Sequence, residues 1–221
     1  MIITKTPFRM SFFGGGTDIE DYFKENGGAV LSTTFDKYCY VNVRHLPRFF
    51  DYSSELTYSK MERVKDTDDI KHPAIREAMK FLDMQEIRLT YEADLPARSG
   101  LGTSSSFAVG MLNAFYALKG KYADKKKLAD EAIYLERVLC NEAGGWQDQI
   151  AASFGGFNRI NFNTDGTYDV LPVIISPERK QHLNNNLMMF FTGFTRFSSE
   201  VQKANNVSGS EEKRVRLKKT V

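Results

Sequence analysis

The sequence predicts an α+β fold, in which strands dominate the first part of the chain and helices follow. Residues 2–13 and 28–44 are rich in β-branched and aromatic side chains, which suit strands. Residues 86–94 alternate between apolar and polar side chains, as a half-buried strand does. Most of the helical patterns come after these strands, from residue 104 onwards. Strands that precede helices, instead of alternating with them one by one, are typical of α+β proteins.

The helical patterns differ in how much of their surface is apolar. A short helix is predicted at residues 74–83. Residues 104–118 are apolar on most of the circumference, which predicts a buried helix, whereas residues 125–142 carry one apolar stripe. A last helix begins near Gln147 and ends at Gly155-Gly156, because glycine commonly terminates helices. Further strands are expected at residues 157–162, 169–175 and 187–192.

Length and composition indicate an ordinary globular protein. The chain has 221 residues, of which 42% are hydrophobic, and a net charge of +2. It has no apolar run of the roughly 20 residues that a membrane helix needs, and its N-terminus does not resemble a signal peptide. Its two cysteines, Cys39 and Cys140, have neither metal-site nor disulfide-framework spacing. We therefore expect a cytoplasmic protein with no membrane partner.

Much of the positive charge lies near the C-terminus. The basic residues there are Lys213, Arg214, Arg216, Lys218 and Lys219. Two interpretations of this segment remain: it could be an arm that binds nucleic acid or membrane, or a solvated or disordered terminus. The absence of interleaved aromatic side chains and the nearly neutral total charge favour a solvated tail and no nucleic-acid partner.

The segment LPARSGLGTSSS, residues 95–106, carries the most chemical information. It lies between a predicted strand and a predicted helix. Its glycines let the backbone approach a ligand, and the N-terminus of the helix offers unpaired N–H groups and a positive dipole end, which suit phosphate. It is neither a Walker A loop nor a dinucleotide fingerprint. On local chemistry alone, a phosphate site and a plain capped turn remain equally open.

Three segments, taken in order, resemble the motifs of the GHMP small-molecule kinases. Residues 95–106 resemble the phosphate-binding motif, with Thr103 in place of the usual first serine. Residues 7–18, PFRMSFFGGGTD, resemble the first motif, and residues 141–149, NEAGGWQDQ, resemble the segment with the catalytic aspartate. The GGGTD and GGWQDQ stretches most resemble the sugar-1-kinase branch, and within it the heptose 7-phosphate kinases.

The resemblance implies roles for individual residues. Asp148 is expected to be the catalytic base, and Arg9 is expected to stabilise charge beside it. The residues expected to bind the ATP phosphates are Pro96, Gly100, Leu101, Gly102, Thr103, Ser104 and Ser105. The residues expected to contact substrate are Gly15, Gly16, Thr17, Asp18 and Gly145. The residues expected to hold Mg²⁺ are Ser104 and Glu136.

Structural roles are the alternatives for several of these residues. Asp148 could be a helix-start carboxylate, Arg9 a surface arginine, Asp18 a turn-forming residue, and Glu136 a boundary position on an amphipathic helix. A phosphate at the far end of the sugar would need further basic groups. The candidates for them are Arg44, Arg48 and Arg98.

The implied fold has two domains, of which the first resembles domain 2 of ribosomal protein S5. Residues 1–175 would form the N-terminal ATP-binding domain, residues 176–206 the start of a C-terminal domain, and residues 207–221 a charged tail. The third, glycine-rich motif of the family is not found in the sequence, so we expect the C-terminal domain to be truncated.

The implied activity is ATP- and magnesium-dependent phosphorylation of a small-molecule sugar phosphate. The expected acceptor is the anomeric hydroxyl of D-glycero-D-manno-heptose 7-phosphate, and the expected product is the 1,7-bisphosphate. Two alternatives remain. One is a fucokinase-like enzyme that acts on another sugar. The other is a truncated, non-catalytic paralogue that binds nucleotide without turnover. The oligomeric state is left open.

Overall fold

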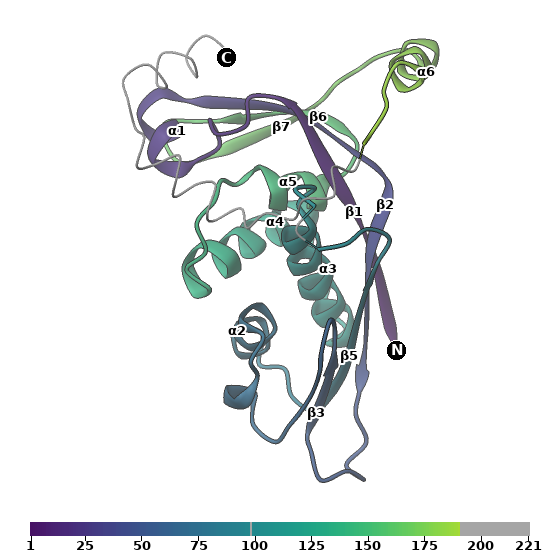
Figure 1. The fold of residues 1–221 in the computed structure, drawn as a ribbon. Coiled ribbons are helices and arrows are strands. Elements are labelled where there is room, and N and C mark those ends of the chain that lie inside the picture. The colour runs from purple at the N-terminus through teal and green to yellow at the C-terminus, as the bar shows by residue number, and fades with distance from the viewer. Residues whose placement is uncertain (98, 191–221) are drawn as a thin grey trace.

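A seven-stranded sheet organises the molecule, and most of its helices lie on one side of that sheet (Figure 1). The structure is a computed structural model that describes residues 1–97 and 99–190. The strands are β1 (Ile2–Phe13), β2 (Gly28–His45), β3 (Ser54–Thr57), β4 (Met61–Val64), β5 (Ile87–Ala93), β6 (Phe157–Phe162) and β7 (Tyr168–Pro172). They run in the order β4-β3-β5-β2-β6-β7, and β1 also pairs with β2.

The long strand β2 is the centre of the sheet. It pairs with β1 along most of its length, with β6 near its start and with β5 near its end, and all three pairings are antiparallel. The helices are α1 (Glu20–Asn26), α2 (Pro73–Phe81), α3 (Thr103–Leu118), α4 (Lys125–Tyr134), α5 (Gln147–Phe154) and α6 (Pro177–Asn185), with the 3₁₀-helix η1 (Thr67–Asp69) and the π-helix η2 (Leu135–Leu139). Within the described ranges, no helix has the length and apolar character of a membrane span.

Helix α3 is buried between the sheet and the other helices. Its apolar side chains, such as Phe115 and Leu112, belong to the main core. Gly110 faces β1 so closely that a Cβ atom there would lie 2.7 Å from the Thr6 hydroxyl oxygen, and the Thr4 hydroxyl donates to the Gly110 carbonyl at 2.9 Å. This contact holds α3 against β1, so the start of α3 is placed beside the middle of that strand.

The α+β prediction is confirmed, and the elements that lead to the phosphate loop agree closely with their predicted ranges. The buried helix predicted at residues 104–118 is α3, and the strand predicted at residues 86–94 is β5. The helix predicted at residues 125–142 is shorter than expected. It continues from α4 into the wider turn of η2 and stops at Leu139. Isolated π-helical turns of this kind often occur at functional sites.

Two predictions at the C-terminal end need correction. The strand predicted at residues 187–192 is wrong for residues 187–190, which have no regular structure; residues 191 and 192 lie outside the described part. Helix α6 was not predicted, because its residues are all exposed and therefore give no apolar period. Its start signals are nevertheless present: the Ser176 hydroxyl accepts from the Arg179 amide, and Pro177 is the first helical residue. The predicted tail at residues 207–221 also lies outside the described part.

Candidate active site

The predicted phosphate loop connects β5 to the N-terminus of α3. Gly102 is the N-cap of α3 and has a left-handed backbone, with φ of 72°, a conformation that glycine adopts without steric cost. A Cβ atom at Gly102 would lie 3.3 Å from the Arg9 side chain and 3.4 Å from Asp148 Oδ2. Glycine therefore lets the loop touch the two residues that were predicted to be catalytic.

The first amides of α3 are available to a ligand. The Ser106 amide is the first that makes a helical hydrogen bond, to the Gly102 carbonyl at 2.9 Å. The amides of Thr103, Ser104 and Ser105 precede it, and the N-cap residue has no side chain to cap them. Such a terminus, with its positive dipole end, can bind phosphate oxygens.

The predicted loop residues differ in exposure. Pro96, Gly100 and Ser104 are exposed, whereas Thr103 and Ser105 are buried. The Leu101 carbonyl accepts from the Arg9 amide at 3.2 Å, which ties the loop to β1. Among the exposed members, Ser104 can reach a ligand through its hydroxyl and Gly100 through its backbone, whereas the buried members can do so only through backbone atoms or by a rearrangement.

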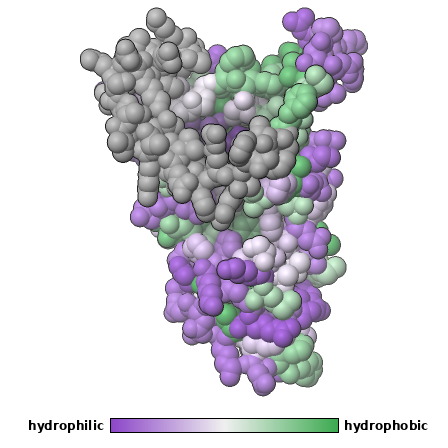
Figure 2. Space-filling model, viewed as in Figure 1, coloured by the Kyte–Doolittle hydropathy of each residue, from purple (hydrophilic) through white to green (hydrophobic). Residues whose placement is uncertain are grey.

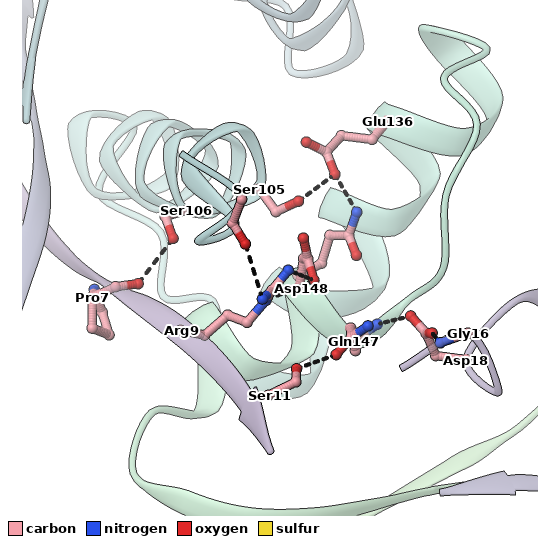
Figure 3. A network of polar contacts seen from close by, with 12 residues as sticks. Pro7, Arg9, Ser11, Gly16, Asp18, Ser105, Ser106, Glu136, Gln147 and Asp148 are labelled. Atoms are coloured by element: carbon pink, nitrogen blue, oxygen red, sulfur yellow. Dashed lines mark hydrogen bonds and ion pairs between the residues drawn. The ribbon is translucent and has the colours of Figure 1, made fainter. Parts of the chain in front are cut away.

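Arg9 and Asp148 form an ion pair at the end of this loop (Figure 3). Arg9 Nε and NH2 lie 2.8 and 2.6 Å from Asp148 Oδ1, and Arg9 NH1 donates to the Gly100 carbonyl at 3.3 Å. The side chains are 14% and 25% exposed, respectively. One guanidinium thus joins β1, the phosphate loop and α5. Both contacts to Asp148 end on Oδ1, which leaves Oδ2 facing the loop.

The charge of Arg9 is stabilised by its neighbours. Burial by itself would lower the pKa of the guanidinium, but the charge and hydrogen bond of Asp148, with a smaller contribution from Asp18, raise that pKa above its ordinary value. Arg9 therefore remains a cation in the site, where it can stabilise negative charge on a transferring phosphoryl group.

Asp18 lies beside this pair, but it is only 2% exposed. Its Oδ1 accepts from the Gly16 amide at 2.9 Å and its Oδ2 from the Gln147 amide at 3.1 Å. Burial and the negative charge of Asp148 raise the pKa of Asp18, against the opposing effect of these two hydrogen bonds. The contacts of Asp18 are thus those of a turn-forming residue. Its carboxylate connects the turn at residues 14–18 to the first turn of α5.

The other residues predicted to contact substrate surround the same turn. Thr17 is fully buried, and its hydroxyl donates to the Gly14 carbonyl at 2.8 Å and accepts from the Ala29 amide at 3.1 Å. Gly15 is exposed, and Gly16 is partly exposed. A ligand could therefore contact mainly the backbone of the glycines in this turn. Thr17 and Asp18 are buried and stabilise the turn through their hydrogen bonds.

Gly145 is required by the position of Asp18. A Cβ atom at Gly145 would lie 1.9 Å from Asp18 Oδ2 and 2.3 Å from its Cγ. We expect Gly145→Ala to displace the carboxylate from its two amide donors and to lower the free energy of unfolding by about 2 to 4 kcal/mol. Urea denaturation of the purified chain measures this change.

Gly15→Ala is the matched control for Gly145→Ala. The atom nearest to a Cβ atom at Gly15 would be the side-chain Nε2 of Gln147, at 3.8 Å. We therefore expect the free energy of unfolding to change by no more than about 0.5 kcal/mol. Equal denaturation midpoints for the two variants would contradict the steric argument.

Glu136 lies on η2, behind the phosphate loop, and is 2% exposed. Its Oε2 accepts from the Ser105 hydroxyl at 2.7 Å (Figure 3). The same oxygen accepts from the Gln149 side-chain amide, and Arg137 NH2 lies 3.5 Å from it. Burial raises the pKa of Glu136 to about 7, although the Arg137 charge and these hydrogen bonds lower it. In this structure Glu136 therefore contacts Ser105, and not Ser104.

The oxygen donors at this place fit magnesium by type. The exposed hydroxyl of Ser104 and the carboxylate of Glu136 are oxygen ligands, and Mg²⁺ in kinases is held by one or two protein oxygens together with substrate phosphates. Over residues 1–97 and 99–190, no cluster of three or more His, Cys, Asp or Glu side chains forms a complete protein cage. The donor types suit an ion that is shared with bound phosphates, although the structure does not bring the buried Glu136 carboxylate into contact with Ser104.

Two glutamines that the sequence analysis passed over also belong to the site. Gln147 and Gln149 flank Asp148 on α5, and Gln147 Oε1 accepts from the Ser11 hydroxyl of β1. The polar triplet Gln147-Asp148-Gln149 at a helix start was the available signal, because three polar side chains in a row cannot all face solvent on a packed helix.

The basic residues considered for a distal phosphate lie elsewhere. Arg9 pairs with Thr34 of β2, whereas Arg44 lies ten residues further along that strand, which is up to about 33 Å at 3.3 Å per residue. Arg48 is 83% exposed and pairs with Glu86 at 2.6 Å, close to the same distant end. Both candidates are too far from Asp148 to hold the same small substrate, and Arg98 lies outside the described residues.

Comparisons with known proteins agree on one family. Residues 70–156 match the GHMP kinases N terminal domain. The chain is 30% identical over 211 residues to a D-glycero-alpha-D-manno-heptose 7-phosphate kinase of Campylobacter jejuni, covering 91% of this chain and 62% of that protein. It is 24% identical over 217 residues to a bifunctional fucokinase/GDP-fucose pyrophosphorylase of Arabidopsis thaliana, covering 88% of this chain and 20% of that protein.

A solved structure gives the same result for the fold. The crystal structure of a D-glycero-D-manno-heptose 1-phosphate kinase from Bacteroides thetaiotaomicron superimposes with a TM-score of 0.71 at 25% identity, covering 80% of this chain and 61% of that one. The chain thus spans about three fifths of the length of both heptose phosphate kinases, with 62% and 61% covered.

Proposed function

We propose that this chain, whose residues 70–156 match the GHMP kinases N terminal domain, is an ATP-dependent kinase that phosphorylates the anomeric hydroxyl of a sugar. The observation that carries the proposal is the meeting of three elements at Gly102. There a Cβ atom added to the phosphate loop would lie within 3.4 Å of both Arg9 and Asp148 Oδ2, and Arg9 NH1 donates to the Gly100 carbonyl of the same loop. A phosphate group on the α3 amides would then lie beside a carboxylate and a guanidinium, as phosphoryl transfer requires.

Asp148 acts as the base in the proposed reaction. Arg9 holds its Oδ1, so Oδ2 accepts the proton of the sugar hydroxyl. As that proton leaves, the hydroxyl oxygen forms a bond to the γ-phosphorus of ATP, the bond from the γ-phosphorus to the bridging oxygen breaks, and ADP departs with that electron pair.

The remaining groups bind and orient the reactants. The amides at the start of α3 bind the transferring phosphate, and Arg9 stabilises its charge. The exposed glycine backbone at Gly15 and Gly16 is placed to approach the sugar. A bound magnesium ion supplies positive charge that offsets the phosphate oxygens, and Ser104 and Glu136 are the residues that would hold it.

The proposed acceptor is D-glycero-D-manno-heptose 7-phosphate. The support for it is the similarity to a heptose 7-phosphate kinase at 30% identity, compared with 24% for the fucokinase. The test is ADP release by the purified chain with magnesium-ATP and heptose 7-phosphate, fucose or no sugar, with the product identified by ³¹P NMR. Release that requires the heptose phosphate supports the proposal.

Two other results would replace this proposal. Release that requires fucose instead would reassign the acceptor. A folded chain that binds ATP but releases no ADP with any of the sugars would favour the non-catalytic alternative. Direct measurement of ATP binding by calorimetry separates the second result from a chain that has lost its nucleotide site.

A further inference from the structure

The residue that follows the proposed base is held in an unusual way. Gln149 has no exposed surface, yet its side chain is polar. Its Nε2 donates to Glu136 Oε2, and its Oε1 has no hydrogen-bond partner among the described residues. Burying an amide with half of its capacity unused is costly in an apolar core. An apolar side chain of similar size could fill the same space, but it could not donate the hydrogen bond that the amide makes to the buried Glu136 carboxylate.

The contact made by Gln149 continues to the phosphate loop. The Glu136 oxygen that accepts from Gln149 also accepts from the Ser105 hydroxyl at 2.7 Å (Figure 3). Ser105, Glu136 and Gln149 are 1%, 2% and 0% exposed, respectively. One buried oxygen atom therefore connects the first turn of α3, the π-helix η2 and the first turn of α5, and water does not compete for these bonds.

The geometry of α5 makes this connection relevant to Asp148. Asp148 and Gln149 are consecutive on a helix, so their side chains point about 100° apart. One faces Arg9 and the other faces Glu136. Because the two residues are adjacent on one helix, a shift or rotation of the helix at Gln149 also moves Asp148.

On the basis of the proposed function, we propose that Gln149 is a positioning residue that sets the distance between the base Asp148 and the phosphate loop through Glu136 and Ser105. It touches neither substrate. Phosphoryl transfer depends on the placement of the base to within a fraction of an ångström, and a misplacement of about 1 Å can cost about 100-fold in rate. The polar link fixes that placement where apolar packing alone would allow the helices to slide.

The first test is Gln149→Met, which keeps the length of the side chain and removes the donor. We expect kcat to fall by about 10- to 100-fold, while KM for ATP changes by less than about 3-fold because the α3 amides remain. Gln181→Met is the matched control, since Gln181 is exposed on α6 and bonds only to Asn185 among the described residues; we expect it to match the wild type.

A second readout does not depend on turnover. Trp146 is the only tryptophan of the chain and is the N-cap of α5, so its fluorescence reports on that helix start. We expect magnesium-ADP to change this emission in the wild type, and we expect Gln149→Met to bind magnesium-ADP with similar affinity by calorimetry while losing at least half of the emission change.

Ser105→Ala breaks the same link from the other end and covers the case in which Gln149→Met does not fold. Alanine is well tolerated in helices, and we expect the same loss of the emission change at saturating magnesium-ADP. A folded Gln149→Met or Ser105→Ala variant with wild-type kcat and wild-type emission change would overturn the inference. A wild-type chain that fails to bind magnesium-ADP would overturn the proposed function, and this inference with it.

Discussion

Asp148→Asn is expected to lower kcat by about 10²- to 10⁴-fold, which is the usual contribution of a positioned general base. Asparagine has nearly the shape of aspartate, and its side-chain oxygen can still accept from Arg9, but it cannot take up the proton of the acceptor hydroxyl. Nucleotide binding depends on the start of α3 and the phosphate loop, so we expect the dissociation constant for magnesium-ATP to change by less than about 3-fold. Initial rates of ADP release and calorimetric titration with ATP measure the two quantities.

Asp165→Asn is the matched control for this change. Asp165 is exposed in the turn between β6 and β7, where it accepts from the Thr167 amide at 2.9 Å, so we expect its kcat to equal that of the wild type. An Asp148→Asn variant that is folded and retains more than a tenth of the wild-type kcat would show that another group accepts the proton. Loss of ATP binding together with kcat would point to a structural role for Asp148.

Much of the fold could be predicted from local sequence, because the elements around the site are strongly patterned. Residues 104–118 are apolar on most sides, and they form the buried helix α3. The short strands β3 and β4 were not predicted, since four residues are too few to show a period. The helix α6 was missed for a different reason: it is polar on every side, and only its capping residues mark it.

The residues of the candidate site could be predicted from the motifs, but their contacts could not. Sequence order separates Arg9 from Asp148 by 139 positions, and only the pairing of β1 with β2 and the packing of α5 bring them together. The role of Gly145 as space for Asp18 depends on a contact between distant segments. The link from Gln149 to Ser105 likewise depends on η2, and a π-helical turn has no reliable signature in a single sequence.

Sequence could not choose among the three candidates for a distal phosphate, for a related reason, and Arg98 lies outside the described residues. Arg44 and Arg48 lie near and just beyond the end of β2, which is 18 residues long and carries them away from Asp148. Nearness in sequence is a poor guide along an extended strand, where each residue adds about 3.3 Å.

Arg9→Met is expected to lower kcat by about 10²- to 10³-fold, as does the loss of a group that stabilises charge in the transition state. Methionine fills much of the same volume but removes the cation from the phosphate loop, together with the donors to Asp148 Oδ1 and to the Gly100 carbonyl. We also expect the free energy of unfolding to fall by about 1 to 3 kcal/mol, because charge-assisted hydrogen bonds in a largely buried pair are lost. Initial rates, corrected for the folded fraction seen by circular dichroism, measure the catalytic effect separately.

Arg9→Lys and Arg63→Met distinguish the role of Arg9 from that of charge or stability alone. Lysine keeps the positive charge but cannot donate to Asp148 and to the loop at the same time, as the planar guanidinium does. We therefore expect a smaller fall in kcat, of about 10-fold. Arg63→Met breaks the contact from Arg63 Nε to Glu55 Oε2, 3.0 Å long, between the edge strand β4 and its neighbour β3, and we expect it to leave kcat unchanged. If Arg9→Met lowered stability as expected but kept wild-type kcat in its folded fraction, Arg9 would be a structural residue, and the stabilisation of phosphoryl charge would have to come from the α3 amides and the bound metal. β3 lies at the lower end of the molecule in Figure 1, where hydrophilic side chains are mixed with apolar patches on the surface (Figure 2); Arg63 contacts Glu55 there and no described residue of the phosphate loop, so its replacement tests the loss of an ion pair without touching the site.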